Sequence, residues 1–201
     1  MTHTLDFVAI QDCPPTFMKT GARLVHSSLP EYYDLLLAGL EEPMAVIEAQ
    51  LQQHSEINQG IVAFADGQPV GIICCYPLAE RADRQTAALV AVLRDRPEQK
   101  QAILRNLRGY MAGIAALSGD GLYLSRVAVA AAWRKQGIAS AMLKVVEEQA
   151  MASGFDRVAL HVAADNAPAR SYYLSHGYQL LPADDCRYLA MQKPLNPYVH
   201  H

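Results

Sequence analysis

Cysteine is scarce in this sequence, and no cysteine is spaced for a metal site or a redox pair. The 201 residues include four cysteines and no C-x-x-C pattern; the four are Cys13, Cys74, Cys75 and Cys186. Cys74 and Cys75 stand inside an apolar run, where cysteine usually acts as a small buried hydrophobe. Adjacent residues of a strand point to opposite faces of a sheet, so these two cannot bond to each other without distortion. We expect no metal site, and the pattern suits a reducing cytoplasm.

An excess of charge of one sign and long hydrophobic runs are also missing. Seventeen basic residues against 20 acidic ones leave a net charge of −3, which predicts no general attraction to nucleic acid. No window approaches the length of a membrane span, and the N-terminus lacks the basic and apolar regions of an export signal. Apolar residues make up 51% of the chain and charged residues 18%, a globular composition. We therefore expect one soluble cytoplasmic domain over residues 1–201, without a membrane or nucleic-acid partner.

A strand, a basic turn and an amphipathic helix follow one another in residues 122–152. Residues 122–129 are rich in branched and aromatic side chains and are short enough for a strand. The apolar residues that follow have the spacing of a helix that buries one face. They are Ile138, Met142, Val145 and Val146. Ser153 and Gly154 predict the end of this helix.

The turn between this strand and helix has the features of an anion site. It reads Arg134-Lys135-Gln136-Gly137-Ile138-Ala139-Ser140. The first turn of a helix has N–H groups without an internal partner and holds the positive end of the helix dipole. Gly137 allows close approach of a ligand, and Arg134 and Lys135 add positive charge. The turn predicts a pyrophosphate site; the alternative is a solvated loop before an ordinary surface helix.

A second strand and helix follow in residues 157–177. Residues 157–163 alternate as a strand does, and Asn166 and Pro168 are typical of the N-cap and first turn of a helix. The helix contains Tyr172 and Tyr173 and is expected to end at Gly177.

These two segments resemble the signatures of the GNAT superfamily of N-acetyltransferases. The first, Arg/Gln-x-x-Gly-x-Gly/Ala, is matched from Arg134 to Ala139. The second is matched by Asn166-x-x-Ala169-x-x-x-Tyr173-x-x-x-Gly177-Tyr178. Two motifs in this order are more specific than either alone. The resemblance is tight over residues 122–181 and elsewhere extends only to the order of strands and helices.

The resemblance implies an α/β (α+β) fold whose mixed, mostly antiparallel sheet is flanked by helices. In this family two parallel strands splay apart, and acetyl-CoA enters the wedge between them. Unpaired backbone groups need partners, and the two amides of pantetheine are suitable. The cofactor-binding residues implied are Val127, Ala128, Val129, Arg134, Lys135, Gln136, Gly137, Ile138, Ala139, Ser140, Asn166 and Tyr173.

Acetyl transfer to an amine requires a deprotonated amine, a stabilised oxyanion and a proton for the departing thiolate. Tyr173 matches the family's tyrosine near the sulphur and is the predicted general acid; the alternative is a core aromatic. Its ordinary pKa of about 10 keeps it protonated at neutral pH. Tyr172 points about 100° away on the helix and is the weaker candidate. A backbone N–H near Val127 is expected to stabilise the oxyanion.

No general base is evident in the sequence. Ser125 stands on the strand where many relatives have a carboxylate, so we expect the proton to leave through water, toward Glu80 or a group on the helices before residue 53. His26 and His161 are further candidate relays, although a lone histidine is more often structural. Arg126 is interpreted as a structural salt bridge, or alternatively as a partner for a carboxylate on the acceptor.

The rest of the chain predicts a strand at residues 5–10, two helices within 29–53, and a hairpin of residues 61–64 and 70–76 with its turn at Asp66 and Gly67. Final strands are expected at residues 178–181 and 187–192, before a tail of residues 194–201 that includes His200 and His201.

Residues 77–121 are expected to form a helical insertion between the third and fourth strands. One helix is predicted at residues 87–93. Asp95, Pro97 and Glu98 have the pattern of the start of another, which contains Gly109 and Gly113. The insertion is expected to cover the acceptor side or to form a homodimer surface; alternatively it thickens the core.

Together these features predict an acetyl-CoA-dependent N-acetyltransferase that uses direct transfer in a ternary complex, because no cysteine accompanies Tyr173 to hold an acyl group. The acceptor expected is a small primary amine, an amino-acid derivative or a protein amino group. The alternative is a CoA-binding regulatory module without catalysis. A nucleotide site is disfavoured because no Gly-Lys-Ser/Thr follows the turn.

Overall fold

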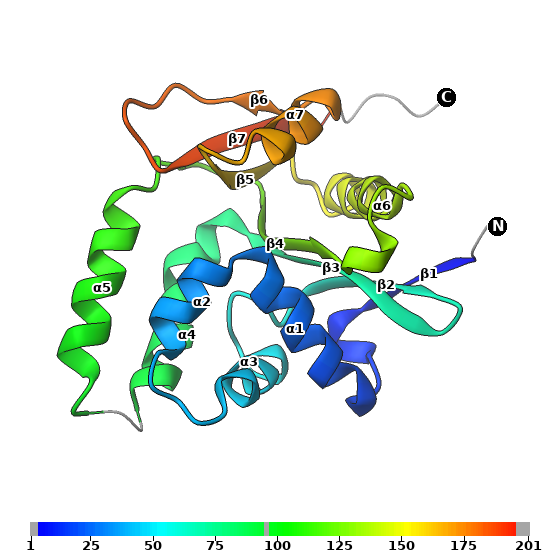
Figure 1. The fold of residues 1–201 in the computed structure, drawn as a ribbon. Coiled ribbons are helices and arrows are strands. Elements are labelled where there is room, and N and C mark those ends of the chain that lie inside the picture. Colours follow the sequence, from blue (N-terminus) through cyan, green and yellow to red (C-terminus); the bar gives the residue numbers. More distant parts are fainter. Residues whose placement is uncertain (1–3, 95–96, 196–201) are drawn as a thin grey trace.

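The computed structural model describes residues 4–94 and 97–195, which form a seven-stranded sheet of order β1-β2-β3-β4-β5-β7-β6 (Figure 1). Only the central pair, β4 and β5, is parallel; the other neighbours pair antiparallel. The strands are β1 Leu5–Ala9, β2 Gly60–Ala65, β3 Gln68–Pro77, β4 Leu122–Val129, β5 Arg157–Ala163, β6 Gln179–Leu180 and β7 Tyr188–Pro194. The expected fold class, a mixed and mostly antiparallel sheet flanked by helices, is confirmed.

Helices cover both faces of the sheet (Figure 1). They are α1 Met18–Ser28, α2 Pro30–Leu37, α3 Pro43–Gln52, α4 Arg81–Leu93, α5 Lys100–Ala112, α6 Ile138–Ala152 and α7 Ala167–Ser175. Buried residues of α1 to α5 form one core cluster with one face of the sheet, and α6 packs in a second cluster against the other face. Cys74 belongs to the first cluster and Cys75 packs against the second, as the alternation of a strand predicts.

Three α-helices precede the hairpin in the described residues. The predicted pair corresponds to α2 and α3, and α1 comes before them. The buried residues of α1, Gly21, Ala22, Leu24 and Val25, have the spacing of one helix face, so the pattern of this helix is present in the sequence although we did not predict it. The hairpin itself has the expected turn. Asp66 and Gly67 have φ angles of 50° and 74°, so both adopt the positive φ that a tight two-residue hairpin turn requires.

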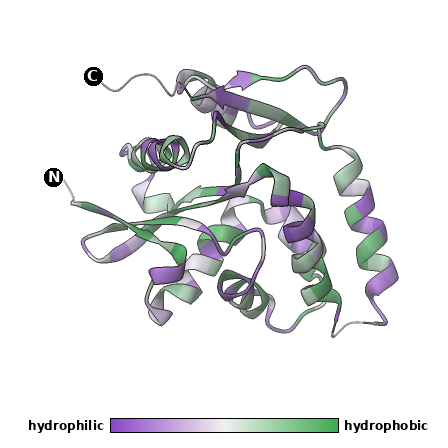
Figure 2. Cartoon of the chain, turned by 180° about the vertical axis from the view of Figure 1, so that it is seen from behind, coloured by the Kyte–Doolittle hydropathy of each residue, from purple (hydrophilic) through white to green (hydrophobic). Residues whose placement is uncertain are grey.

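The described residues of the insertion contain two α-helices, as expected, but the bounds of these helices differ from the prediction. Helix α4 begins at Arg81 rather than at residue 87, and α5 begins at Lys100 with Gln99 as its N-cap. The predicted cap Asp95 lies outside the described residues. Figure 2 shows hydrophilic and hydrophobic residues alternating along α5, whose buried residues face the core.

Gly109 and Gly113, which we expected inside the second helix of the insertion, do not mediate a close contact between helices. A Cβ added at Gly109 would meet no atom within 4 Å, so this position lies in open space. Gly113 is not inside the helix but is its C-cap, where an added Cβ would lie 2.9 Å from Cβ of Arg187. The expectation of two interior glycines is therefore wrong for Gly113.

The end of the described chain is more ordered than the tail that we expected from residue 194. Strand β7 extends to Pro194, and Leu195 is buried with its N–H donating to the carbonyl of Asp156 at 2.7 Å. His200 and His201 lie outside the described residues.

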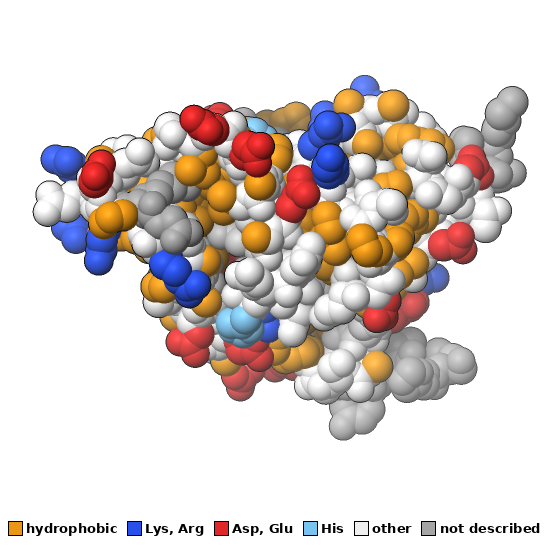
Figure 3. Space-filling model, turned by 90° about the horizontal axis from the view of Figure 1, so that it is seen from below, with side chains coloured by type: hydrophobic (Ala, Val, Ile, Leu, Met, Phe, Trp, Pro, Cys, Tyr) orange, Lys and Arg blue, Asp and Glu red, His pale blue; other side chains and the backbone are white. Residues whose placement is uncertain are grey.

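Within residues 4–94 and 97–195, no helix has the length and apolar character needed to span a bilayer. Figure 3 shows acidic and basic side chains interspersed on the face seen from below.

Candidate functional site

The two parallel strands at the centre of the sheet separate part of the way along their length. Pairing between β4 and β5 begins at Leu122 with Val158 and ends at Leu124 with Leu160, although β4 continues to Val129. The separation starts at a β-bulge. Cys74 of β3 pairs with Arg126 and Cys75 with Leu124, so Ser125 has no partner residue on β3. A bulge bends its strand, and here the bend coincides with the point where β4 leaves β5.

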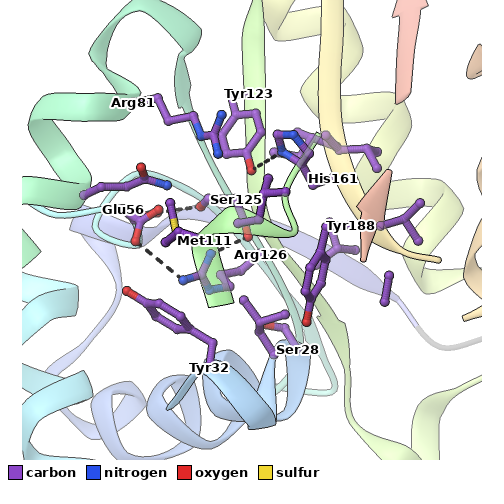
Figure 4. Close-up of a pocket in the computed structure, with 18 of the residues that line it drawn as sticks. Ser28, Tyr32, Glu56, Arg81, Met111, Tyr123, Ser125, Arg126, His161 and Tyr188 are labelled. Atoms are coloured by element: carbon purple, nitrogen blue, oxygen red, sulfur yellow. Dashed lines mark hydrogen bonds and ion pairs between the residues drawn. The ribbon is translucent and has the colours of Figure 1, made fainter. Parts of the chain in front are cut away.

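A cavity of about 430 Å³ lies at this separation and extends beneath the insertion (Figure 4). We call its two ends the splay end and the insertion end. The splay end is lined by residues of β4, β5 and α7, namely Val127, Leu160, Val162, Asn166, Ala169 and Tyr173. The insertion end is lined by residues of α2, α4, α5, β7 and the loop before β2, among them Tyr32, Glu56, Arg81, Tyr110, Met111 and Tyr188. The helices of the insertion therefore cover one end of the cavity.

Tyr173 and Tyr172 have different surroundings, as their positions on α7 predict. Tyr173 is 8% exposed, lines the splay end, and has rings of Tyr172 and Tyr178 at centroid distances of 5.4 Å. Burial raises the pKa of Tyr173 well above its ordinary value, so its hydroxyl stays protonated. Tyr172 does not line the cavity; its hydroxyl lies 3.3 Å from Ser140 Oγ.

The turn before α6 presents open backbone N–H groups. Gly137 is the N-cap of α6 with φ of 78°, and no side chain caps this helix. By contrast, Asn166 caps α7 by accepting a hydrogen bond from the N–H of Ala169 at 3.1 Å. A Cβ added at Gly137 would meet no atom within 4 Å, so the approach to the first turn of α6 is open. These unpaired donors and the helix dipole make the turn suitable for an anion.

Two side chains of the turn anchor it to neighbouring backbone. Arg134 Nε donates to the carbonyl of Val129 at 3.0 Å, and Gln136 Nε2 donates to that of Ala132 at 3.2 Å. Farther into the helix, Ser140 Oγ lies 2.8 Å from His176 Nε2, just past α7. The turn thus lies between the end of β4 and α7, the elements that supply the splay end.

The structure places the predicted cofactor-binding residues in four settings. Val127, Asn166 and Tyr173 line the cavity, whereas Arg134 to Gly137 are exposed outside it. Ala139 and Ser140 are half-buried at the start of α6, and Val129 is half-buried at the end of β4. The side chains of Ala128 and Ile138 are buried in the two core clusters, so only their backbone could meet a ligand.

A buried carboxylate that the sequence pattern did not reveal lies beside Ser125. Glu56, in the loop before β2, is 5% exposed and lines the insertion end. Ser125 Oγ donates to the backbone carbonyl of Glu56 at 2.5 Å, which holds this loop against the bulge. Oε1 of Glu56 accepts from the Tyr76 hydroxyl at 3.4 Å. A single acidic residue in a polar loop gives no sequence signal, and only folding brings it to β4.

The contacts of Arg126 are those of a structural salt bridge, which was our first interpretation of this residue. Its Nη2 lies 3.6 Å from Oε2 of Glu56, its Nε donates to the Tyr33 hydroxyl at 3.1 Å, and its Nη1 donates to the carbonyl of Ser125 at 2.7 Å. The guanidinium also lies 5.3 Å from the ring centroid of Tyr32. All its nitrogens are engaged with the protein.

Of the other candidate relays, only His161 reaches the cavity. Glu80 is bound to Arg84 Nε at 2.7 Å and His26 to Asp34 at 3.1 Å, and neither lines the cavity. His161 Nε2 donates to the carbonyl of Ala115 at 2.9 Å, so in the neutral ring Nδ1 accepts from the Tyr123 hydroxyl, also at 2.9 Å. Burial, together with the positive charge of Arg81, lowers the pKa of His161 to about 4.

We expect His161 to make stability pH-dependent between its ordinary pKa of 6.5 and its folded value of about 4. In this window the unfolded chain binds more protons than the folded one, so the free energy of unfolding falls as the pH falls. The full effect is on the order of 3 kcal/mol. Denaturant unfolding of the wild type and of His161→Gln at pH 7, 5.5 and 4 measures it. Equal pH slopes for both proteins would contradict this assignment.

Comparison with known proteins identifies the family. The model of the acetyltransferase (GNAT) family matches residues 23–178. Among solved structures, an N-acetyltransferase from Staphylococcus aureus Mu50 has a TM-score of 0.66 and 18% identity over 94% of this chain and 98% of its own. Another acetyltransferase has a TM-score of 0.65 and 22% identity over 96% of this chain and 100% of its own.

A third similar structure is the PaiA N-acetyltransferase from Thermoplasma acidophilum in complex with coenzyme A. Its TM-score is 0.54 and its identity 14%, over 95% of this chain and 99% of its own. At these identities the solved structures establish the fold. A comparison with curated proteins finds no match. Because the family model covers most of the sequence, the chain belongs to the GNAT family of acetyltransferases.

Proposed function

We propose that this protein is an acetyl-CoA-dependent N-acetyltransferase that transfers an acetyl group directly to an amine in a ternary complex. The observation that supports this most is the cavity at the separation of β4 and β5, which holds Tyr173 at one end and the carboxylate of Glu56 at the other. One group can supply a proton and the other can accept one, as acyl transfer to an amine requires. The similar PaiA structure contains coenzyme A, which supports the choice of cofactor.

The cofactor proposal rests on groups at both sides of the splay. The open N–H groups from Gly137 to Ser140 would bind the pyrophosphate, with the exposed Arg134 and Lys135 adding charge. The edge of β4 beyond Leu124 no longer pairs with β5, so backbone groups at Val127 to Val129 could meet the pantetheine amides, apart from the Val129 carbonyl that accepts from Arg134. Asn166 both caps α7 and lines the cavity beside this edge. When bound, acetyl-CoA supplies the thioester whose carbonyl carbon the amine attacks.

Three groups of the chain have roles in this proposal. Glu56 accepts the proton of the attacking amine, a role that Ser125 cannot perform. The backbone N–H at Val127 donates to the thioester oxygen as negative charge develops on it. Tyr173 donates its proton to the departing sulphur. The apolar walls at this end disfavour a thiolate, so protonation of the sulphur removes a charge that the cavity solvates poorly.

Release of free thiol from acetyl-CoA, measured against a panel of amines, tests the proposed activity, with calorimetry measuring CoA binding in parallel. We expect CoA to bind and at least one amine to be acetylated. Binding of CoA with no amine acetylated would favour the regulatory module instead. Failure of CoA to bind would contradict both.

Gly137→Val is expected to raise the KM for acetyl-CoA by roughly ten- to a hundredfold, because its side chain would occupy the approach to the N–H groups of α6. The positive φ at Gly137 means that valine also strains the backbone there. Gly154 is a matched control, since it follows the other end of α6 with φ of 82° and equally open surroundings. Steady-state kinetics of Gly137→Val and Gly154→Val separate the two effects. If both variants change the KM for acetyl-CoA equally, backbone strain and not a blocked anion site explains the effect.

A further inference from the structure

One half-buried arginine in the cavity lacks the ion-pair and hydrogen-bond partners that two fully buried arginines nearby have. Arg126 is bound by Glu56 and Tyr33, and Arg84 is bound by Glu80, Asn58 and the carbonyl of Ser55. Arg81, at the start of α4, forms no ion pair with any residue that the structure describes, and its Nε is buried without a hydrogen-bond partner there. A buried guanidinium donor without an acceptor is costly, and a ligand is a common source of the missing acceptor.

Arg81 lies in the insertion end of the cavity, away from Tyr173. Its guanidinium carbon is 5.2 Å from the ring centroid of Tyr123, and Figure 4 shows it across the cavity from Tyr32 and Tyr188. Besides the effect of burial, the positive charge of Arg81 contributes to the lowered pKa of His161, so this charge lies near the cavity wall that β5 forms. Arg81 also lines a second hollow, of about 350 Å³, and so stands at the boundary between the two.

We propose that the acceptor is a small amine that also has a carboxylate, which binds to Arg81 while the amino group faces Glu56 and the thioester. This inference rests on the proposed acetyltransferase function. A carboxylate matches the planar guanidinium in geometry, and its single negative charge matches the single uncompensated positive charge. A phosphate has a charge of about −1.5 to −2 at neutral pH and would leave an excess of negative charge near Glu56.

The wall of the insertion end that lies across the cavity from Arg81 is largely aromatic, which favours an acceptor with an apolar body. Ring centroids of Tyr32 and Tyr110 lie 5.6 Å apart, and those of Tyr110 and Tyr188 lie 5.2 Å apart. Met111 and Leu89 add apolar surface. An α-amino acid with an apolar or aromatic side chain combines the required ammonium, carboxylate and body. The cavity volume of about 430 Å³ is in the range of small-molecule sites.

The test compares L-phenylalanine, L-phenylalaninamide and 2-phenylethylamine as acceptors for the full-length protein and for Arg81→Gln. We expect L-phenylalanine to be preferred by the wild type. Arg81→Gln should raise its KM by roughly ten- to a hundredfold, because a charge-assisted hydrogen bond is lost, and should leave the KM values of the two carboxylate-free amines unchanged. Arg105→Gln, on the exposed surface of α5, controls for the loss of one positive charge.

The outcomes separate this inference from the proposed function. Acetylation that does not depend on the carboxylate, or an equal effect of Arg81→Gln on all three amines, overturns the inference and leaves the acetyltransferase function in place. Preference for O-phosphoethanolamine over β-alanine, or for a peptide over the free amino acid, also overturns it. Binding of L-phenylalanine that requires Arg81 and is seen by calorimetry with CoA, but without turnover, supports the inference and contradicts the function. If L-phenylalanine does not bind and none of the three amines is acetylated, both the inference and the proposed function are overturned.

Discussion

Tyr173→Phe is expected to lower kcat for acetyl transfer by about a hundredfold or more, with little change in the KM for acetyl-CoA. The substitution removes only the hydroxyl that would protonate the departing sulphur. The ring of Tyr173 is buried and packs against Tyr172 and Tyr178, and phenylalanine preserves these contacts. The effect should therefore fall on catalysis and not on the fold. Steady-state kinetics at saturating acetyl-CoA measure it.

Tyr172→Phe is the matched control for this experiment. It removes a hydroxyl from the adjacent position of α7, where that hydroxyl meets Ser140 outside the cavity. We expect kcat to stay within about twofold of the wild type, since no reacting atom is near it. If Tyr173→Phe retains its kcat, Tyr173 is a core aromatic and the sulphur receives its proton from another group. If Tyr172→Phe loses as much activity as Tyr173→Phe, packing of α7 accounts for both.

Glu56→Gln is expected to lower kcat/KM at neutral pH by about a hundredfold or more, because the amide cannot accept the proton of the amine. The deficit should shrink above about pH 9, where a larger fraction of the amine is already deprotonated in solution. A purely structural role would not produce this convergence of the two pH profiles. Rates measured from pH 6 to pH 10 therefore identify the function of Glu56.

Two controls accompany this variant. Glu80→Gln changes the acidic residue that the sequence suggested as a proton acceptor but that the structure places outside the cavity, bound to Arg84. We expect it to retain activity. Thermal unfolding of Glu56→Gln is also needed, because Glu56 lies 3.6 Å from the buried guanidinium of Arg126 and loss of its charge leaves that cation less compensated. A loss of activity that parallels unfolding and is the same at every pH would contradict the role of base.

The segments that the sequence predicted most accurately are those whose signals are local. The bounds of β4 and β5 agree with the predicted strands, and α6 begins at Ile138 as its apolar spacing indicates. Asn166 caps α7 through its own side chain, three residues from the N–H that it accepts. Such features depend on neighbours along the chain. Helix α1 was not predicted, and α4 was predicted to begin at residue 87 and not at Arg81; neither helix has a side-chain cap that would mark its start.

The sequence by itself determined the turn that opens α6 and the position of Tyr173 on its helix, because periodicity, caps and motif spacing depend on residues close together in the chain. The fold class was implied by the resemblance of these motifs to the GNAT family. Only the tertiary structure decided that Glu56 lies beside the Ser125 bulge and that Arg81 enters the cavity with its Nε unpaired among the residues that the structure describes. Glu56 is 69 residues from Ser125 along the chain. Such a contact depends on where a loop and a strand meet after folding. The chemical roles of Glu56 and Arg81 can therefore be inferred only from the folded arrangement of the sheet, the bulge and the insertion.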